Sequence, residues 1–518
     1  MSAPKAVERL KVETPLLSEE SRPGRRAVSV PEPRVPERSL DEMIPAELRR
    51  KEEAGLPELG ELQVVRHFTR LSQKNFSIDG QFYPLGSCTM KYNPRINEKA
   101  AALPGFAEIH PGQPAEQVQG ALELYWRLEE MLKAITGLDA ISLQPAAGAQ
   151  GELTGLLCIR AYHRDRGGAA GARRRKVLIP DSAHGTNPAS ATLADLDSVP
   201  LRTAKDGTVD LGDLEKRLDD TVAALMITNP STLGLFERNI QRIAARLHEA
   251  GALLYMDGAN LNAMIGVVRP GDFGVDVMHI NMHKTLSTPH GGGGPGSGPI
   301  AVTRALEPYL PVPRIVREGE RFALDRDRPR SIGKVKAWHG HAGMVWRAYA
   351  YLRAHSRADL AGIARTAVLN ANYILARLRD HYDLPYPGPC MHEVVLSGRR
   401  QKLRTGVRTL DIAKRLLDYG YHPPTIYFPL IVEEALMIEP TETESKETLD
   451  RFCDAMIAIA REALESPDLL REAPATLPVR RLDEVAAARE PRVRWADGGA
   501  LARPAELGPP QGPERPTA

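Results

Sequence analysis

Short apolar runs alternate with helical patterns through the middle of this chain. The runs are bounded by turn residues, and the segments between them carry apolar residues at helical spacing. Such runs are typical of buried strands in a largely parallel sheet that helices cover on both faces. The pattern therefore predicts an α/β layered fold, with strands at Lys176–Pro180, Val222–Thr228, Ala252–Met256, Val275–Ile280 and Pro299–Val302.

The two ends of the chain lack this alternation. Residues 1–45 are rich in proline, arginine and glutamate, which predicts an extended arm rather than a packed unit. Residues 496–518 carry few bulky apolar side chains and are predicted to form a disordered tail. Between them we expect a large α/β domain at residues 46–340 and a smaller C-terminal α+β domain at residues 341–495.

Helical spacing of apolar residues predicts the individual helices. The clearest lies at residues 120–136, where Gly137 stands in the position of a C-cap. Further helices are predicted at Glu152–Tyr162 and at about residues 443–465. The segment 303–338 is rich in proline, arginine and glutamate, so we expect a long connection there.

Composition narrows the range of partners and compartments. The chain has 68 basic and 66 acidic residues, and a net charge of +2 gives no reason to expect a nucleic-acid or membrane partner. No apolar run approaches the ~18 residues that span a bilayer, and the N-terminus lacks the apolar segment of a secretory signal. The four cysteines form no C-x-x-C pair, which predicts buried thiols, no metal site and a cytoplasmic protein.

Polar segments follow four of the predicted strands. In an open α/β sheet, ligands bind at the carboxyl ends of the strands. Because parallel strands end at one edge of the sheet, we expect these segments to converge on one site. They are Asp181–Ser190, Asn229–Gly234, Asp257–Asn260 and Asn281–Thr285.

The residues in these segments match the needs of a pyridoxal-phosphate cofactor. Such a site needs a lysine for a Schiff base, a carboxylate on the pyridine nitrogen and a flat group against the ring. Lys284, Asp257 and His184 supply these three groups. The phosphate needs backbone N–H groups at a helix N-terminus, and the small residues of 144–152 expose them before a predicted helix. The remaining cofactor contacts are expected from Gly148, Ala149, Gln150, Thr232, Ala259 and His283.

Each of these residues alone has a simpler explanation. Lys284 is a solvated charge at a strand end, Asp257 begins an Asp-Gly turn, and His184 is a hydrogen-bonded histidine of the surface or core. The stretch 146–151 is then an ordinary turn into a helix, since it lacks the motifs of a P-loop or a dinucleotide site. Their order at successive strand ends favours the cofactor site.

Several long segments resemble the glycine decarboxylase (P-protein) family of the glycine cleavage system, in the lysine-bearing subunit 2 of its two-subunit form. The resemblance runs from about Pro15 to Trp495. One stretch departs from it, because Trp338-His-Gly-His-Ala-Gly343 stands where the family usually has Tyr-Gly-Asn-Phe, and no role is assigned there. The matching segments are Gly86–Pro94, Gln144–Glu152, Asp181–Ser190, Asp257–Asn262, His279–Thr285 and Glu439–Ser445.

The resemblance implies a fold-type I pyridoxal-phosphate transferase fold and a specific activity. Glycine is decarboxylated on the cofactor held by Lys284, and the aminomethyl group passes to the lipoyl group of the H-protein. The resemblance also implies a subunit 1 that lacks the lysine, and two copies of each subunit.

Two alternatives remain open from the sequence. An aminotransferase or a cysteine desulfurase would use the same cofactor, and Cys88 is the candidate for the mobile thiol that a desulfurase needs. A non-catalytic scaffold subunit would suit a homologue without the lysine, but Lys284 is present.

Overall fold

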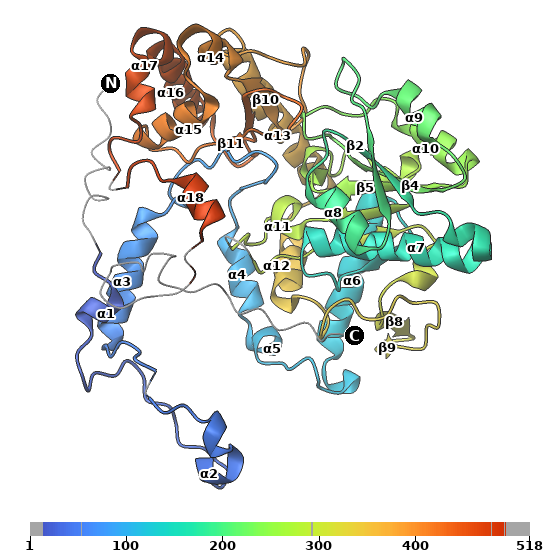
Figure 1. The fold of residues 1–518 in the computed structure, drawn as a ribbon. Coiled ribbons are helices and arrows are strands. Elements are labelled where there is room, and N and C mark those ends of the chain that lie inside the picture. The colour runs from blue at the N-terminus through green and yellow to red at the C-terminus, as the bar shows by residue number, and fades with distance from the viewer. Residues whose placement is uncertain (1–13, 53, 292–293, 478, 492, 494–518) are drawn as a thin grey trace, which may run out of the picture.

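The computed structural model describes residues 14–52, 54–291, 294–477, 479–491 and 493. Within these residues the largest element is a seven-stranded sheet with the order β1-β7-β6-β5-β4-β2-β3 (Figure 1). Strands β3, β2, β4, β5 and β6 are parallel neighbours, whereas β7 is antiparallel to both β6 and β1. The strands are β1 (Ala140–Ser142), β2 (Lys176–Pro180), β3 (Asp197–Leu201), β4 (Val222–Thr228), β5 (Leu253–Gly258), β6 (Val277–Ile280) and β7 (Ile300–Val302).

Both faces of this sheet are buried. Successive residues of a strand point to opposite faces, and in β4 Leu225 and Ile227 join one apolar core while Ala224 and Met226 join another. The first core includes α6 and α10, and the second includes α7. This two-sided burial explains the unbroken apolar runs of the central strands. The helices are α6 (Gln119–Thr136), α7 (Gly148–Ala172), α8 (Thr186–Leu193), α9 (Leu211–Arg217), α10 (Ile240–Glu249) and α11 (Met282–Thr285).

A second, smaller sheet lies in the C-terminal part of the chain. Its order is β10-β12-β11, with antiparallel pairs, and helices α14 to α17 gather beside it (Figure 1). A separate apolar core fills this region. The elements are α12 (Ala342–Arg353), α13 (Arg357–Leu378), β10 (Val394–Ser397), α14 (Arg399–Thr405), α15 (Thr409–Asp418), β11 (Thr425–Ile426), β12 (Ala435–Ile438), α16 (Lys446–Glu465), α17 (Pro467–Arg471) and α18 (Glu484–Arg489).

Packing suggests where the two domains meet. Helix α12 packs against α4 and α6, and Trp346 of α12 belongs to the core of the large sheet. Helix α13 packs into both regions: Ala364 belongs to a core of the large sheet, and Ala371 belongs to the core of the C-terminal region. We therefore propose a domain boundary within α13, later than the predicted residue 340.

The N-terminal segment before α6 extends across the molecule. Its elements are α1 (Leu17–Glu20), α2 (Leu40–Met43), α3 (Glu61–Lys74), α4 (Arg95–Ala101) and α5 (Pro104–Ala107). Figure 1 shows α2 on a stretch that extends away from the rest of the molecule. Between α3 and α4 the chain contacts the small sheet, since Leu85 pairs with Ile438 and the Thr425 hydroxyl donates to the Gly86 carbonyl over 2.7 Å.

The predicted α/β class and largely parallel sheet are confirmed, with three corrections. The segment 303–338 is not a plain connection, because it contains the hairpin of β8 (Arg314–Glu318) and β9 (Arg321–Asp325). Strands β1 and β3 were not predicted: β1 is short, and β3 is a largely exposed edge strand. Helix α7 begins before the predicted Glu152 and ends after Tyr162.

Two further expectations concern the ends of the chain and membranes. The predicted tail at 496–518 and the first 13 residues of the predicted arm lie outside the described residues. Among the described helices, none has both the length and the apolar character needed to cross a bilayer.

A glycine allows α7 to lie close against the sheet. A Cβ atom on Gly155 would stand 2.4 Å from Cε2 of Tyr255 and 2.9 Å from side-chain atoms of Val277 and Ile300. These neighbours are fully buried, so they have little room to move. The contact explains why a residue of poor helix propensity stands inside this helix.

Gly155→Ala should destabilise the protein by about 1–3 kcal/mol, because the added methyl overpacks this contact. Urea unfolding followed by circular dichroism measures the change. The control is Gly167→Ala in the same helix, where a Cβ would meet nothing within 4 Å; it should be neutral or gain up to about 1 kcal/mol. Equal stability of Gly155→Ala and the wild type would contradict the close packing.

Candidate active site

The polar segments after the parallel strands meet at one edge of the large sheet. Thr232, after β4, donates its hydroxyl hydrogen to the carbonyl of Ser182, after β2. Asn187, at the start of α8, donates to Asp257 Oδ2 at the end of β5 over 3.0 Å. The structure thus joins segments that lie far apart in the sequence.

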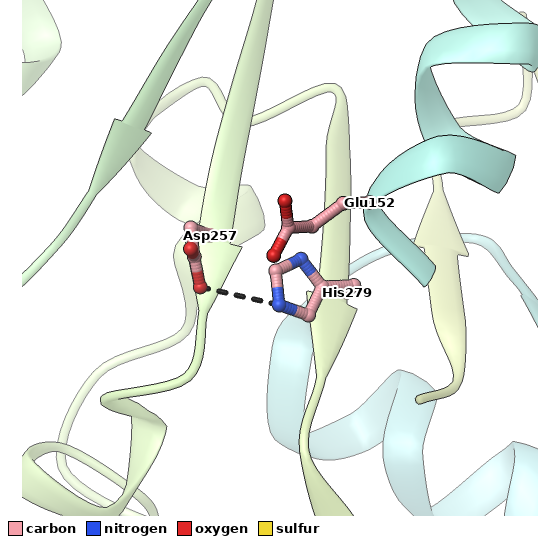
Figure 2. A group of neighbouring side chains, drawn as sticks. All are labelled: Glu152, Asp257 and His279. Carbon is pink, nitrogen blue, oxygen red and sulfur yellow. Dashed lines mark ion pairs between the residues drawn. The ribbon is translucent and has the colours of Figure 1, made fainter. Parts of the chain in front are cut away.

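Asp257 and His279 form a buried ion pair at this edge (Figure 2). Strand register places the two residues side by side on β5 and β6, and His279 Nε2 lies 3.2 Å from Asp257 Oδ1. The other ring nitrogen, Nδ1, lies 3.0 Å from the hydroxyl of Tyr255. The Ala259 N–H also donates to Asp257 Oδ1 over 2.9 Å.

This network fixes the charges of both partners. Burial alone would raise the pKa of Asp257, but the His279 charge and the donors of Asn187 and Ala259 hold that pKa well below its usual range. Burial alone would lower the pKa of His279, but the Asp257 carboxylate raises it above its ordinary value. The two partners therefore stabilise each other's ionised forms.

Glu152 of α7 lies beside this pair (Figure 2). It accepts hydrogen bonds from the hydroxyls of Thr186 at 2.8 Å and Ser190 at 3.0 Å. Ligand atoms of Glu152, Asp257 and His279 all lie within 4.8 Å of one another, a spacing that a metal ion could use. Both nitrogens of His279 already have partners, however, so the ring offers no lone pair and the group is better described as a hydrogen-bond network.

Lys284 stands in the short helix α11, directly after β6. Its side chain is buried, and Nζ donates to the carbonyl of Ser87 over 2.6 Å. Ser87 belongs to the segment between α3 and α4 that crosses to the small sheet. A primary amine is thus held inside the protein next to the polar strand ends.

The N-terminus of α7 lies beside these groups and is suited to an anion. Gly148, Ala149 and Gln150 form its first turn, where backbone N–H groups have no partner within the helix. Gly148 and Gly298 permit close packing, since Cβ atoms there would lie 2.5 Å from Asn281 Oδ1 and 2.0 Å from the carbonyl oxygen of Ala147.

Several buried polar atoms in the segments that form this site have no hydrogen-bond partner among the described residues. An unpaired buried polar group is costly, so these atoms fit a site built for a polar ligand. Together with the N-terminus of α7, these atoms suit a phosphate group. The Asp257 carboxylate suits the pyridine nitrogen of pyridoxal, and the Lys284 amine suits its aldehyde. The atoms are Asn187 Oδ1, Asn281 Oδ1, His283 Nδ1, Thr285 Oγ1 and Ser297 Oγ.

The other predicted residues take different positions. His184 is exposed, and its ring meets Phe428 of the small domain edge-on at 5.6 Å between centroids. His283 is largely buried, and burial together with the Lys284 charge lowers its pKa to about 3, so it is neutral. The side chain of Gln150 bonds the Ala146 N–H and the Val335 carbonyl, which leaves only its backbone facing the predicted phosphate position.

Sequence reasoning missed residues that support the site. His279, Glu152 and Asn187 all occur in the segments that carried the resemblance, but no role was assigned to them. Lys91 was missed as well: its buried ammonium bonds Glu442 Oε1 and the Thr285 carbonyl, at 2.8 and 2.9 Å. His279 could have been noticed in the sequence, because it is a polar residue inside the otherwise apolar strand β6.

Solved structures with a similar fold come from two kinds of protein. A crystal structure of glycine decarboxylase (P-protein) of the glycine cleavage system, in inhibitor-bound form, matches with a TM-score of 0.68 and 22% identity, covering 81% of this chain and 95% of that one. A cysteine desulfurase from Thermococcus onnurineus matches with a TM-score of 0.57 and 16% identity, covering 74% of this chain and 95% of that one. These neighbours confirm the fold-type I architecture.

Relatives match over nearly the whole chain. Proteins named "probable glycine dehydrogenase (decarboxylating) subunit 2" are 59% identical in Exiguobacterium sibiricum and 58% identical in Halalkalibacterium halodurans. Each match covers 93% of this chain, and 97% and 98% of the respective relative. The family model described as glycine cleavage system P-protein matches residues 37–320, and that described as glycine dehydrogenase, C-terminal domain, matches residues 363–472. The chain therefore belongs to the P-protein family of the glycine cleavage system.

Proposed function

We propose that this chain is the lysine-bearing subunit of a pyridoxal-phosphate-dependent glycine decarboxylase, and that Lys284 holds the cofactor. The observation that carries the proposal is the joint placement of a buried lysine amine and an ionised Asp257 at one sheet edge. Family membership supports the same activity. Asp257, His184, Thr232, Ala259, His283 and the first turn of α7 (Gly148, Ala149 and Gln150) are the proposed cofactor contacts.

The residues of this chain prepare the site for decarboxylation. Pyridoxal phosphate, when bound, supplies an electron sink for the bond between the α-carbon and carboxylate of glycine. Asp257 stays ionised through its donors and can hold a proton on the pyridine nitrogen, while His279 keeps that carboxylate in place. The exposed ring of His184, whose Nδ1 lies 2.9 Å from the Thr186 hydroxyl, would cover a flat ligand, and the N–H groups of α7 would bind the phosphate.

The proposal extends to the acceptor and the partner subunit. The aminomethyl group would pass to the lipoyl group of an H-protein, and a subunit 1 without the lysine would complete the enzyme, with two copies of each subunit. The names of the relatives, which call them subunit 2, support a partner subunit.

Exposed apolar side chains near the N-terminus support a partner surface. Val28 and Val30 of the arm are 75% and 87% exposed. In α3, Leu62, Val65 and Phe68 recur at every third position and are all more than half exposed. Apolar stripes of this kind usually face another element, and the described part of the chain leaves this one uncovered.

A cysteine desulfurase is the less favoured alternative. Such an enzyme needs a thiolate, but burial, as the largest effect, raises the pKa of Cys88 above its ordinary value. The thiol is half-buried beside Met90, with 3.7 Å between the sulfur atoms. A protonated, half-buried thiol is a poor nucleophile.

Replacing Lys284 with alanine should remove covalent cofactor attachment, because the amine that forms the bond is gone. The wild-type chain loaded with pyridoxal phosphate should be yellow and keep the cofactor after borohydride reduction and dialysis, whereas Lys284→Ala should lose it. Lys446→Ala, at a surface lysine paired with Asp450, is the control: it should be yellow before reduction and keep the cofactor after reduction and dialysis. Cofactor retained by reduced Lys284→Ala would refute the assignment.

Replacing Asp257 with asparagine should lower both the pKa of His279 and the enzyme activity. Without the carboxylate, burial should lower the pKa of His279, which a nuclear magnetic resonance titration of the labelled ring can follow. His248, whose pKa is raised by Asp276 through a hydrogen bond, should titrate as before. Activity should fall by ~2–4 kcal/mol of transition-state stabilisation, the range for losing a preorganised electrostatic group. Wild-type activity in this variant would exclude Asp257 from the cofactor site.

The chain alone should be an incomplete enzyme. Adding subunit 1 should raise glycine-dependent bicarbonate exchange and form a larger particle by light scattering, since a stable interface of this kind usually buries more than ~2,000 Å². The double variant Val65→Asp, Phe68→Asp should lose this assembly, and Leu403→Asp, at an exposed leucine elsewhere, should keep it. Full activity of the chain without a partner would contradict the proposal.

A further inference from the structure

Two buried glutamates face each other at the edge of the small sheet. Glu393 directly precedes β10 and Glu439 directly follows β12, and these strands are antiparallel with Val394 opposite Ile438. The two residues are 0% and 1% exposed. Carboxylate oxygens of both residues and a ring nitrogen of His392 all lie within 4.8 Å of one another.

Few donors serve these carboxyl groups. Glu393 Oε2 accepts from the Ser87 N–H over 3.0 Å, and Glu439 Oε1 accepts from the Thr89 hydroxyl. The second oxygen of each carboxyl group has no hydrogen-bond partner among the described residues. Both ring nitrogens of His392 also lack a hydrogen bond there, and the nearer one lies 3.9 Å from Glu439 Oε1.

The surrounding charges do not neutralise two carboxylates. Burial raises the pKa of both groups: that of Glu439 to about 7, and that of Glu393 well above its ordinary value with a further rise from Glu439. Lys284 lowers both pKa values in part, and Lys91 and Glu442 act on Glu439 in opposite directions. The remaining neighbours add no positive charge, because burial lowers the pKa of His392 to about 3 and raises that of Cys88.

Ser87 connects the glutamates to the lysine. Its carbonyl accepts from Lys284 Nζ while its N–H donates to Glu393. Ser87 has a φ of 62°, a left-handed conformation that a residue with a side chain rarely adopts. The two hydrogen bonds hold this backbone unit between the lysine and the carboxyl pair, and strained backbone of this kind is common at functional sites.

We propose that Glu393 and Glu439 share one proton near neutral pH and so place a single negative charge beside Lys284, which stabilises the protonated lysine nitrogen. Two carboxyl groups this close and this poorly solvated cannot both ionise without a large cost. The pair acts through Lys284 and Ser87, so both glutamates are positioning residues. The proposed effect of the two glutamates on the cofactor depends on the proposed function of Lys284. The proposal that they share a proton does not depend on it.

The charges favour a proton over a metal ion at this cluster. Two carboxylates and an imidazole resemble a metal ligand set, but Lys284 already brings a positive charge to the same space. A divalent ion would have to overcome that repulsion. A proton satisfies the carboxyl pair without adding a full second charge.

Infrared difference spectroscopy of the full chain tests the shared proton with or without cofactor. Raising the pH through about 7 should remove the carbonyl band of one of the two carboxyl groups and leave the band of the other, which holds the shared proton. The double variant Glu393→Gln, Glu439→Gln should lose both bands, and Glu433→Gln, at an exposed glutamate of the same domain, should keep them. Glutamine has the shape of a protonated glutamate, so both proteins should fold. A band that persists in the double variant, or a bound divalent metal in wild type that the double variant lacks, would overturn the proposal.

The visible absorbance of the cofactor-loaded chain tests the effect on the lysine. Removing the negative charge in the double variant should move the pH midpoint of the visible band to lower pH, and Glu433→Gln should leave it unchanged. If the infrared band behaves as expected and the midpoint does not move, the shared proton stands and the positioning role is wrong. If the chain never binds the cofactor through Lys284, the proposed function fails while the infrared result still decides the shared proton.

Discussion

The buried ammonium of Lys91 is the interaction on which the arrangement of the site depends. A cation inside a protein is tolerated only with close partners, and this side chain is 1% exposed. Its nitrogen lies within 3.2 Å of four oxygen atoms, so the chain segments that carry them must all be in place at once. Those atoms are Asn262 Oδ1, the Thr285 carbonyl, the Tyr351 hydroxyl and Glu442 Oε1.

These four partners explain how the two domains share one site. Thr285 adjoins Lys284, Tyr351 comes from α12, and Glu442 follows the small sheet. The segment that carries Lys91 also carries Ser87, which contacts Lys284 and Glu393. Because one short segment bonds to both domains, a shift of the small domain would disturb the lysine as well. The site is therefore built by contacts between distant segments and not by the large sheet alone.

The sequence predicted those parts whose signal is local. Strands β2 and β4 have the predicted bounds, because buried strands leave unbroken apolar runs. Lys284 and Asp257 could be singled out from their positions at strand ends. The pairing of Asp257 with His279 could not, because it depends on which strands are neighbours and on their register. The same holds for Glu393 and Glu439, which face each other only through the antiparallel pairing of β10 with β12.

Carboxyl groups of similar burial differ in their protonation in this molecule. Asp257 receives donors from His279, Asn187 and the Ala259 backbone, so its ionised form is the stable one despite burial. Glu393 and Glu439 each receive one hydrogen bond and face each other, so burial dominates and favours a proton. The number of donors that the fold brings to each group, and not the residue type or its depth, decides its charge. Lys284 consequently lies between an anion that stays ionised at neutral pH and a carboxyl pair whose charge depends on pH.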